Sequence, residues 1–156
     1  MSSKILRGFT LVELLIVIAI LAILSTLGIS NFQTARIKAR DLSRKSDLQT
    51  IAKSLEAYVN DHRSYPLSDV DHKIICKTGS SCNWGQPFTD DAGTIYTAAL
   101  PSDPVGATYQ YISTTGTSYT LYAHIENTED PNIQTGLGIS CGTLECNYKI
   151  TSSNIQ

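Results

Sequence analysis

An almost unbroken apolar run near the N-terminus restricts most strongly what this chain can fold into. Residues 8–24 read GFTLVELLIVIAILAIL, in which Glu13 is the one charged side chain, and the next charge is Arg36. A helix of about 20 apolar residues crosses the roughly 30 Å hydrocarbon layer of a bilayer. The run therefore predicts a transmembrane helix over residues 9–30.

Residues 1–8 form a short basic leader that contains Lys4 and Arg7. Leaders of this kind precede translocated apolar segments. An ordinary secretory signal peptide, cut near Gly28-Ile29-Ser30, is the simplest alternative. That alternative gives Glu13 no purpose, whereas a charge at the centre of a membrane helix costs roughly 2.5–3.5 kcal/mol and normally has a partner or a function.

Glu13 acquires a partner if the chain is cut between Gly8 and Phe9. The new α-amine then stands four residues before the carboxylate, which is about one helical turn. When such helices pack side by side with an axial stagger, the amine of one subunit also meets the carboxylate of the next. Our hypothesis is that Glu13 is retained because assembly neutralises it.

The helical pattern continues beyond the apolar run. One predicted buried stripe follows the spacing i, i+3, i+4, i+7 and comprises Leu48, Ile51, Ala52, Leu55, Val59 and His62. We therefore expect residues 31–63 to form an amphipathic continuation of the helix. Pro66 is expected to end it, because its ring removes a hydrogen-bond donor and restricts the residue before it.

Residues 64–156 have the composition of a small β-rich head. The clearest hairpin pairs residues 107–113 with 117–125 through Thr114-Thr115-Gly116, and a last strand is predicted at 145–150. Residues 69–91 are expected to be loop-rich. The fold class predicted is α+β, with a long N-terminal helix packed on a small antiparallel sheet.

Charge is divided unevenly along the chain. Residues 1–45 carry seven Lys or Arg against two acids, whereas the remainder carries five against twelve. The acidic head makes nucleic acid an unlikely partner. A basic run, comprising Arg36, Lys38, Arg40, Arg44 and Lys45, is expected to be a solvated face, with contact to lipid headgroups or to an acidic neighbour as the alternatives.

Four cysteines occur as two close pairs, Cys76 with Cys82 and Cys141 with Cys146. Disulfides are the expected use if the head faces an oxidising compartment. Three connectivities remain open from the sequence. A zinc site competes less well, since the spacings are unusual and the histidines are scattered.

The residues around Glu13 resemble a known signal. RGFTLVELLIVIAILAIL is similar to the class III signal sequence of type IV pilins and type II secretion pseudopilins. Residues 46–66 resemble the second half of the pilin helix and the start of the head, and LPSDPVGATYQY, residues 100–111, is similar to a segment of major pseudopilins.

The resemblance implies how the chain is processed and assembled. A prepilin peptidase would cut after Gly8 and methylate Phe9, and Glu13 would pair with a neighbour's terminus. The implied partners are copies of the chain, other pilins or pseudopilins, a membrane assembly platform and, before assembly, the lipid bilayer of the inner or cytoplasmic membrane. The assembled product would be a periplasmic or cell-surface filament with residues 9–30 in its core.

The resemblance also bears on the C-terminal loops. Many pilins close the C-terminal loop with a disulfide, and the resemblance implies the same for Cys141 and Cys146. Major pseudopilins often hold calcium in a C-terminal loop, and Glu126, Asn127, Glu129 and Asp130 stand near the corresponding place without matching the pattern. Calcium is therefore a candidate ligand, while a solvated acidic turn, with no cofactor, is the simpler expectation.

The function predicted first is a structural subunit of a type IV pilus, and the second is a type II secretion pseudopilin. A monomeric, membrane-tethered binding domain with a tyrosine-rich head is an alternative of a different class, but it does not need Glu13. Catalysis is not expected, because the paired carboxylates Asp90-Asp91 and Asp69/Asp71 lack a neighbouring base, nucleophile or phosphate loop.

Overall fold

The computed structural model describes residues 8–152, and within them the side chains of residues 8–25 and 32–152. Residues 1–7 of the predicted leader lie outside the described residues. The chain divides into two compact units, Met1–Ile37 and Lys38–Gln156. Each is described separately below.

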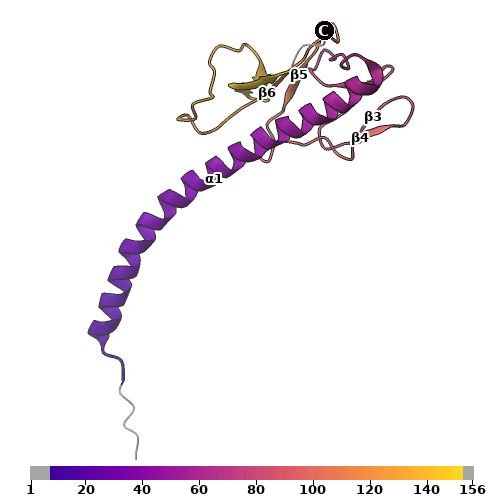
Figure 1. The fold of residues 1–156 in the computed structure, drawn as a ribbon. Helices are drawn as coiled ribbons and strands as arrows, with labels where there is room; N and C mark the ends of the chain where they lie inside the picture. The colour runs from indigo at the N-terminus through magenta and orange to yellow at the C-terminus, as the bar shows by residue number, and fades with distance from the viewer. Residues whose placement is uncertain (1–7, 153–156) are drawn as a thin grey trace, which may run out of the picture. The chain divides into compact units, whose positions relative to one another are not determined.

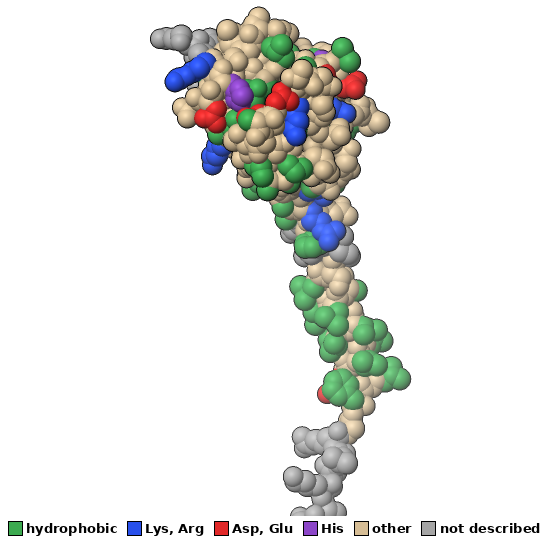
Figure 2. All heavy atoms as spheres, turned by 90° about the vertical axis from the view of Figure 1, so that its right-hand side faces the viewer, with side chains coloured by type: hydrophobic (Ala, Val, Ile, Leu, Met, Phe, Trp, Pro, Cys, Tyr) green, Lys and Arg blue, Asp and Glu red, His purple; other side chains and the backbone are tan. Residues whose placement is uncertain are grey.

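The long predicted helix is confirmed, because α1 extends over Leu11–His62. Within the first unit its large apolar side chains are exposed, and Figure 2 shows hydrophobic side chains gathered along this part of the helix. Among the residues that the structure describes, no helix is both long enough and apolar enough to span a membrane.

The helix ends at His62, within one residue of the predicted bound at residue 63, but Arg63 rather than Pro66 ends it. Arg63 adopts a left-handed conformation with φ of 62°, and its N–H donates to the Val59 carbonyl at 2.7 Å. This is the αL type of C-terminal cap, which stops the helix before proline has any influence.

The second unit packs the C-terminal part of α1 onto a small sheet (Figure 1). The strands β5 (Gln110–Ile112), β6 (Thr120–Ala123) and β9 (Tyr148–Thr151) form this antiparallel sheet in the order β5-β6-β9. Tyr111 is paired with Leu121, and Leu121 with Ile150. The predicted hairpin and last strand are therefore confirmed, although β5 and β6 are shorter than expected and β9 begins at Tyr148 rather than at residue 145.

The core joins the two elements through the predicted stripe, although its last member, His62, is exposed. Leu48, Ile51 and Leu55 of α1 are fully buried against the sheet. Burying each such side chain contributes roughly 1.5–3 kcal/mol. Tyr109, Tyr111, Tyr119, Leu121 and Ala123 complete the sheet side of this core. The tyrosines therefore serve packing rather than a recognition surface.

The hairpin turn depends on Gly116. Its φ is 75°, and a Cβ placed there would lie 3.1 Å from the Tyr65 carbonyl oxygen. The Gly116 carbonyl in turn accepts the N–H of Tyr65 at 2.8 Å. A glycine here thus allows the turn to rest against the segment that follows the helix.

Short two-stranded pairs complete the head. β1 (Ile75–Lys77) pairs with β2 (Ser80–Ser81), β3 (Phe88–Thr89) with β4 (Ile95–Thr97), and β7 (Ser140–Cys141) with β8 (Leu144–Glu145). The region 69–91 therefore contains more regular structure than predicted. Cys76 is bonded to Cys82, which closes the β1-β2 hairpin. Cys141 is bonded to Cys146, which closes the β7-β8 hairpin.

Candidate functional site

The predicted processing and assembly residues lie together at the start of α1. Gly8 and Phe9 precede the helix in irregular backbone, and Phe9 is 77% exposed. Glu13 lies in the first turn of the helix. The bond between Gly8 and Phe9 therefore lies just outside regular structure, a few residues before Glu13.

Glu13 has a local role in addition to the one predicted from the sequence. Its Oε2 accepts hydrogen bonds from the Thr10 N–H at 2.9 Å and from the Thr10 hydroxyl at 2.8 Å, while the Glu13 N–H donates to Thr10 Oγ1 at 3.2 Å. This reciprocal pattern is a capping box, for which Thr-x-x-Glu is the sequence signature. This signature is visible in the sequence as Thr10-Leu11-Val12-Glu13.

A second polar site lies in the head, where α1 meets two loops. Arg44 is 1% exposed and forms ion pairs with Asp41 at 2.7 Å, with Asp103 at 2.6 Å and with Glu126 at 2.7 Å. On either side of it, Arg40 pairs with Glu126, and Lys45 with Asp130 at 2.6 Å. We call this set the ion-pair cluster: Arg40, Asp41, Arg44, Lys45, Asp103, Glu126 and Asp130.

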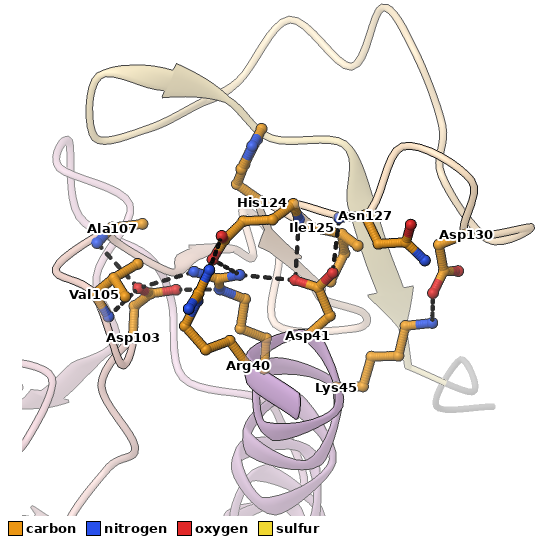
Figure 3. A network of polar contacts seen from close by, with 12 residues as sticks. Arg40, Asp41, Lys45, Asp103, Val105, Ala107, His124, Ile125, Asn127 and Asp130 are labelled. Atoms are coloured by element: carbon orange, nitrogen blue, oxygen red, sulfur yellow. Dashed lines mark hydrogen bonds and ion pairs between the residues drawn. The ribbon is translucent and has the colours of Figure 1, made fainter. Parts of the chain in front are cut away.

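The carboxylates of the cluster also hold loop backbone (Figure 3). Asp41 accepts the N–H groups of Glu126 at 2.9 Å and Asn127 at 2.8 Å. Asp103 accepts the N–H of Val105 at 2.9 Å and of Ala107 at 3.2 Å. The cluster therefore fixes the loop that follows β6 and the turn before β5 to one stretch of the helix.

Electrostatics within the cluster favour the charged forms. The hydrogen bond from Arg40, supported by Arg44, lowers the pKa of Glu126 to about 2, although partial burial opposes this. The ammonium of Lys45 lowers the pKa of Asp130. Burial works against the charge on Arg44, but hydrogen bonds to Asp103 and Glu126 outweigh it and raise the pKa of the guanidinium. Glu126, Asp130 and Arg44 therefore stay ionised at neutral pH.

The expected solvated basic face is thus wrong for Arg44 and only partly right for its neighbours. Arg36 and Lys38 are exposed, and Arg36 lies over the ring of Phe32. Arg40, Arg44 and Lys45 instead meet acids of the same chain. For the exposed Arg36 and Lys38, contact with lipid headgroups or with an acidic neighbour stays a prediction.

The calcium candidates are brought together, but two of them already have cationic partners. Glu126, Asn127 and Asp130 lie in the loop after β6, with Glu126 and Asp130 in the ion-pair cluster. Across the described residues, no group of three or more His, Cys, Asp or Glu side chains is arranged to hold a metal ion.

The carboxylates considered for catalysis have structural partners. Asp90 faces His62 at 3.1 Å and accepts the Tyr96 hydroxyl at 3.0 Å, and Asp91 accepts the Thr78 hydroxyl at 2.7 Å. Asp69 accepts the N–H groups of Asp71 and Lys73. These contacts tie loops together, so the arrangement resembles turn stabilisation rather than an active site.

Comparison with known proteins shows the family of the chain. Residues 6–29 match the prokaryotic N-terminal methylation motif, and residues 31–131 match the family described as type II secretion system (T2SS), protein G. An N-terminal methylation motif on a long helix with a small antiparallel head defines a prepilin-like subunit. The chain belongs to the type II secretion system protein G family within that class.

Individual relatives come from two kinds of system. The chain is 32% identical over 107 residues to the type II secretion system core protein G of Dickeya chrysanthemi, covering 69% of this chain and 68% of that protein. It is 30% identical over 106 residues to the same component of Pseudomonas aeruginosa, covering 68% and 72%. It is also 32% identical over 117 residues to the type IV wide pilus major component PilA4 of Thermus thermophilus, covering 75% and 72%. No solved structure matches the chain.

The family is one of structural pilin and pseudopilin subunits and is not an enzyme family. Membership in it implies assembly with other pilins into a filament.

Proposed function

We propose that this chain is the repeating subunit of an extracytoplasmic filament that is assembled from a membrane through its N-terminal helix. A prepilin peptidase cuts between Gly8 and Phe9 and methylates the new amine. Residues 9–30 hold the subunit in the inner or cytoplasmic membrane until a membrane assembly platform transfers it into a periplasmic or surface filament. The N-terminal methylation motif over residues 6–29 is the observation that carries this proposal.

The exposed apolar part of α1 supplies the packing surface. In the isolated chain its large side chains are about half exposed or more, among them Leu11, Leu14, Ile18 and Leu21. Such a surface is not stable in water and needs lipid or other helices around it. Because lipid tails and packed helices are similarly apolar, transfer between the membrane and a filament changes the free energy little.

Glu13 sets the register between subunits in this proposal. Its Oε2 completes the cap with Thr10, and the carboxylate also pairs with the Phe9 amine of a neighbouring subunit. An uncompensated carboxylate among packed apolar helices is unfavourable by several kcal/mol, so a subunit enters the filament only at the height where this pair forms.

The type II secretion pseudopilus is the filament that we propose first, because the protein G family matches residues 31–131. From the sequence alone, a type IV pilus is the first expectation. That form stays as the second candidate, since the Thermus thermophilus pilus component is as similar in identity as the secretion proteins. In either filament, the acidic head faces outward and repels nucleic acid.

Immunogold electron microscopy tests the filament proposal. Cells that produce the chain at native level are sheared, and both the surface material and the remaining envelopes are labelled with antibody against the head. We expect labelled fibres, in the surface fraction for a pilus and in the envelope fraction for a pseudopilus. Label on dispersed single subunits in both fractions would contradict the proposal and favour a membrane-tethered binding domain.

A further inference from the structure

We infer that the basic side chains of α1 take the place of a calcium ion in this head, by fastening the loop 126–130 to the helix without metal. The resemblance to major pseudopilins implies calcium near this loop, but the residues present do not fit that ion. The inference concerns the head alone and does not depend on filament assembly.

The first support is the engagement of the loop carboxylates. Calcium requires six to eight oxygen ligands at about 2.3–2.6 Å. Both carboxylate oxygens of Glu126 are bonded to arginine, with Arg40 on both of them and Arg44 on Oε1. The Asp130 carboxylate bonds Lys45 and also caps its own loop through the Asn132 N–H at 3.0 Å. Because these oxygens already bond to cationic side chains and to backbone, they are not arranged around a common point where an ion could bind.

The second support is the position of the Lys45 ammonium. A cavity of about 180 Å³ lies between the helix and the loop, and Asp41, Asn127 and Asp130 are among the residues that line it. Lys38 and Lys45 line the same cavity, with Nζ of Lys45 2.6 Å from Asp130. The ammonium also lies 5.3 Å from the centre of the Tyr148 ring on β9, which holds it by a cation–π contact. A positive charge is therefore already fixed where a cation would bind.

The third support is charge balance. The ion-pair cluster contains three cations and four carboxylates, so the anionic charge is nearly neutralised. A divalent cation entering it would meet three positive side chains within a few residues of one another, with Arg44 fully buried. Displacing these side chains would leave them without partners, which is unfavourable for buried charges.

Hydrogen bonds and ion pairs hold the loop against the helix, as a bound metal ion would. Asp41 joins it to the helix through the N–H groups of Glu126 and Asn127, and the flanking ion pairs hold its two ends. The helix residues of the ion-pair cluster span only Arg40 to Lys45, so about one and a half turns of α1 hold the loop at both ends.

Calcium dependence is tested on the full chain in detergent micelles. Thermal unfolding is followed by Trp84 fluorescence in millimolar CaCl2 and in EGTA, and calcium binding is measured by titration calorimetry. We expect the same Tm in both buffers and no binding heat. A higher Tm in calcium, or heat from one bound ion, would overturn the inference.

Lys45→Met tests whether the ammonium anchors the loop, with Lys53→Met on the exposed face of the same helix as the matched control. We expect Lys45→Met to lower the Tm by about 2–5 °C in both buffers. Hydrogen exchange should become severalfold faster at the amides of residues 126–132, while Lys53→Met leaves both readouts unchanged. Equal behaviour of the two variants would refute the anchoring role.

Discussion

Glu13→Gln is expected to abolish filament assembly while leaving the subunit folded and processed. Glutamine also completes a capping box, so the bonds with Thr10 are retained and only the charge is lost. The neighbour's Phe9 amine then has no counter-charge in apolar surroundings, which is unfavourable by about 3–5 kcal/mol. The yield of fibres, quantified by immunoblot of the sedimented fraction, should fall by about tenfold or more.

Thr10→Val is the matched control, since it removes the capping hydroxyl but keeps the carboxylate. Loss of a cap destabilises a helix by about 1 kcal/mol, so this variant should still assemble at a reduced yield. If Glu13→Gln formed fibres as well as the unaltered chain at equal protein level, the charge would not be needed. Capping alone would then account for the acid.

Arg44→Met is expected to destabilise the head more than any other single change in the ion-pair cluster. Methionine fills a similar apolar volume but leaves the carboxylates of Asp41 and Asp103 buried without their cation. Removing one partner of a buried pair costs about 3–5 kcal/mol. Thermal unfolding should therefore show a Tm lower by about 10 °C or more.

A double variant separates lost charge from lost packing. When Asp103→Asn is added to Arg44→Met, one stranded charge disappears, so the loss of stability should be smaller than the sum of the two single changes. The exposed Lys53→Met should remain within about 0.5 kcal/mol of the unaltered chain. A Tm for Arg44→Met close to that of Lys53→Met would show that the buried cluster does not stabilise the head.

The main elements were predictable because their signals are local and periodic. The stripe containing Leu48, Ile51 and Leu55 specifies one buried helix face, and each of these residues is fully buried. Alternation along 119–125 likewise specified the inward face of β6, since Leu121 and Ala123 are buried while Tyr122 is half-buried. Strand ends were predicted less well, because pairing stops where the backbone leaves the sheet and side-chain alternation continues beyond that point.

The ion-pair cluster was not predictable in the same way. A basic run on a helix is usually solvated, and nothing within residues 36–45 indicates that Arg44 is buried. Its partners Asp103 and Glu126 lie 59 and 82 positions further along the chain and approach only after the head folds. Asp103 belongs to the LPSDPVGATYQY segment, so a resemblance marked the residue without indicating its partner.

The N-terminal residue of the mature chain tests the central claim most directly, because pairing with Glu13 requires a free amine on Phe9. Mass spectrometry of subunits purified from membranes or fibres measures it. We predict a chain that begins at Phe9 and carries one additional methyl group. A chain that retains residues 1–8, or that begins near Ser30, would contradict the account.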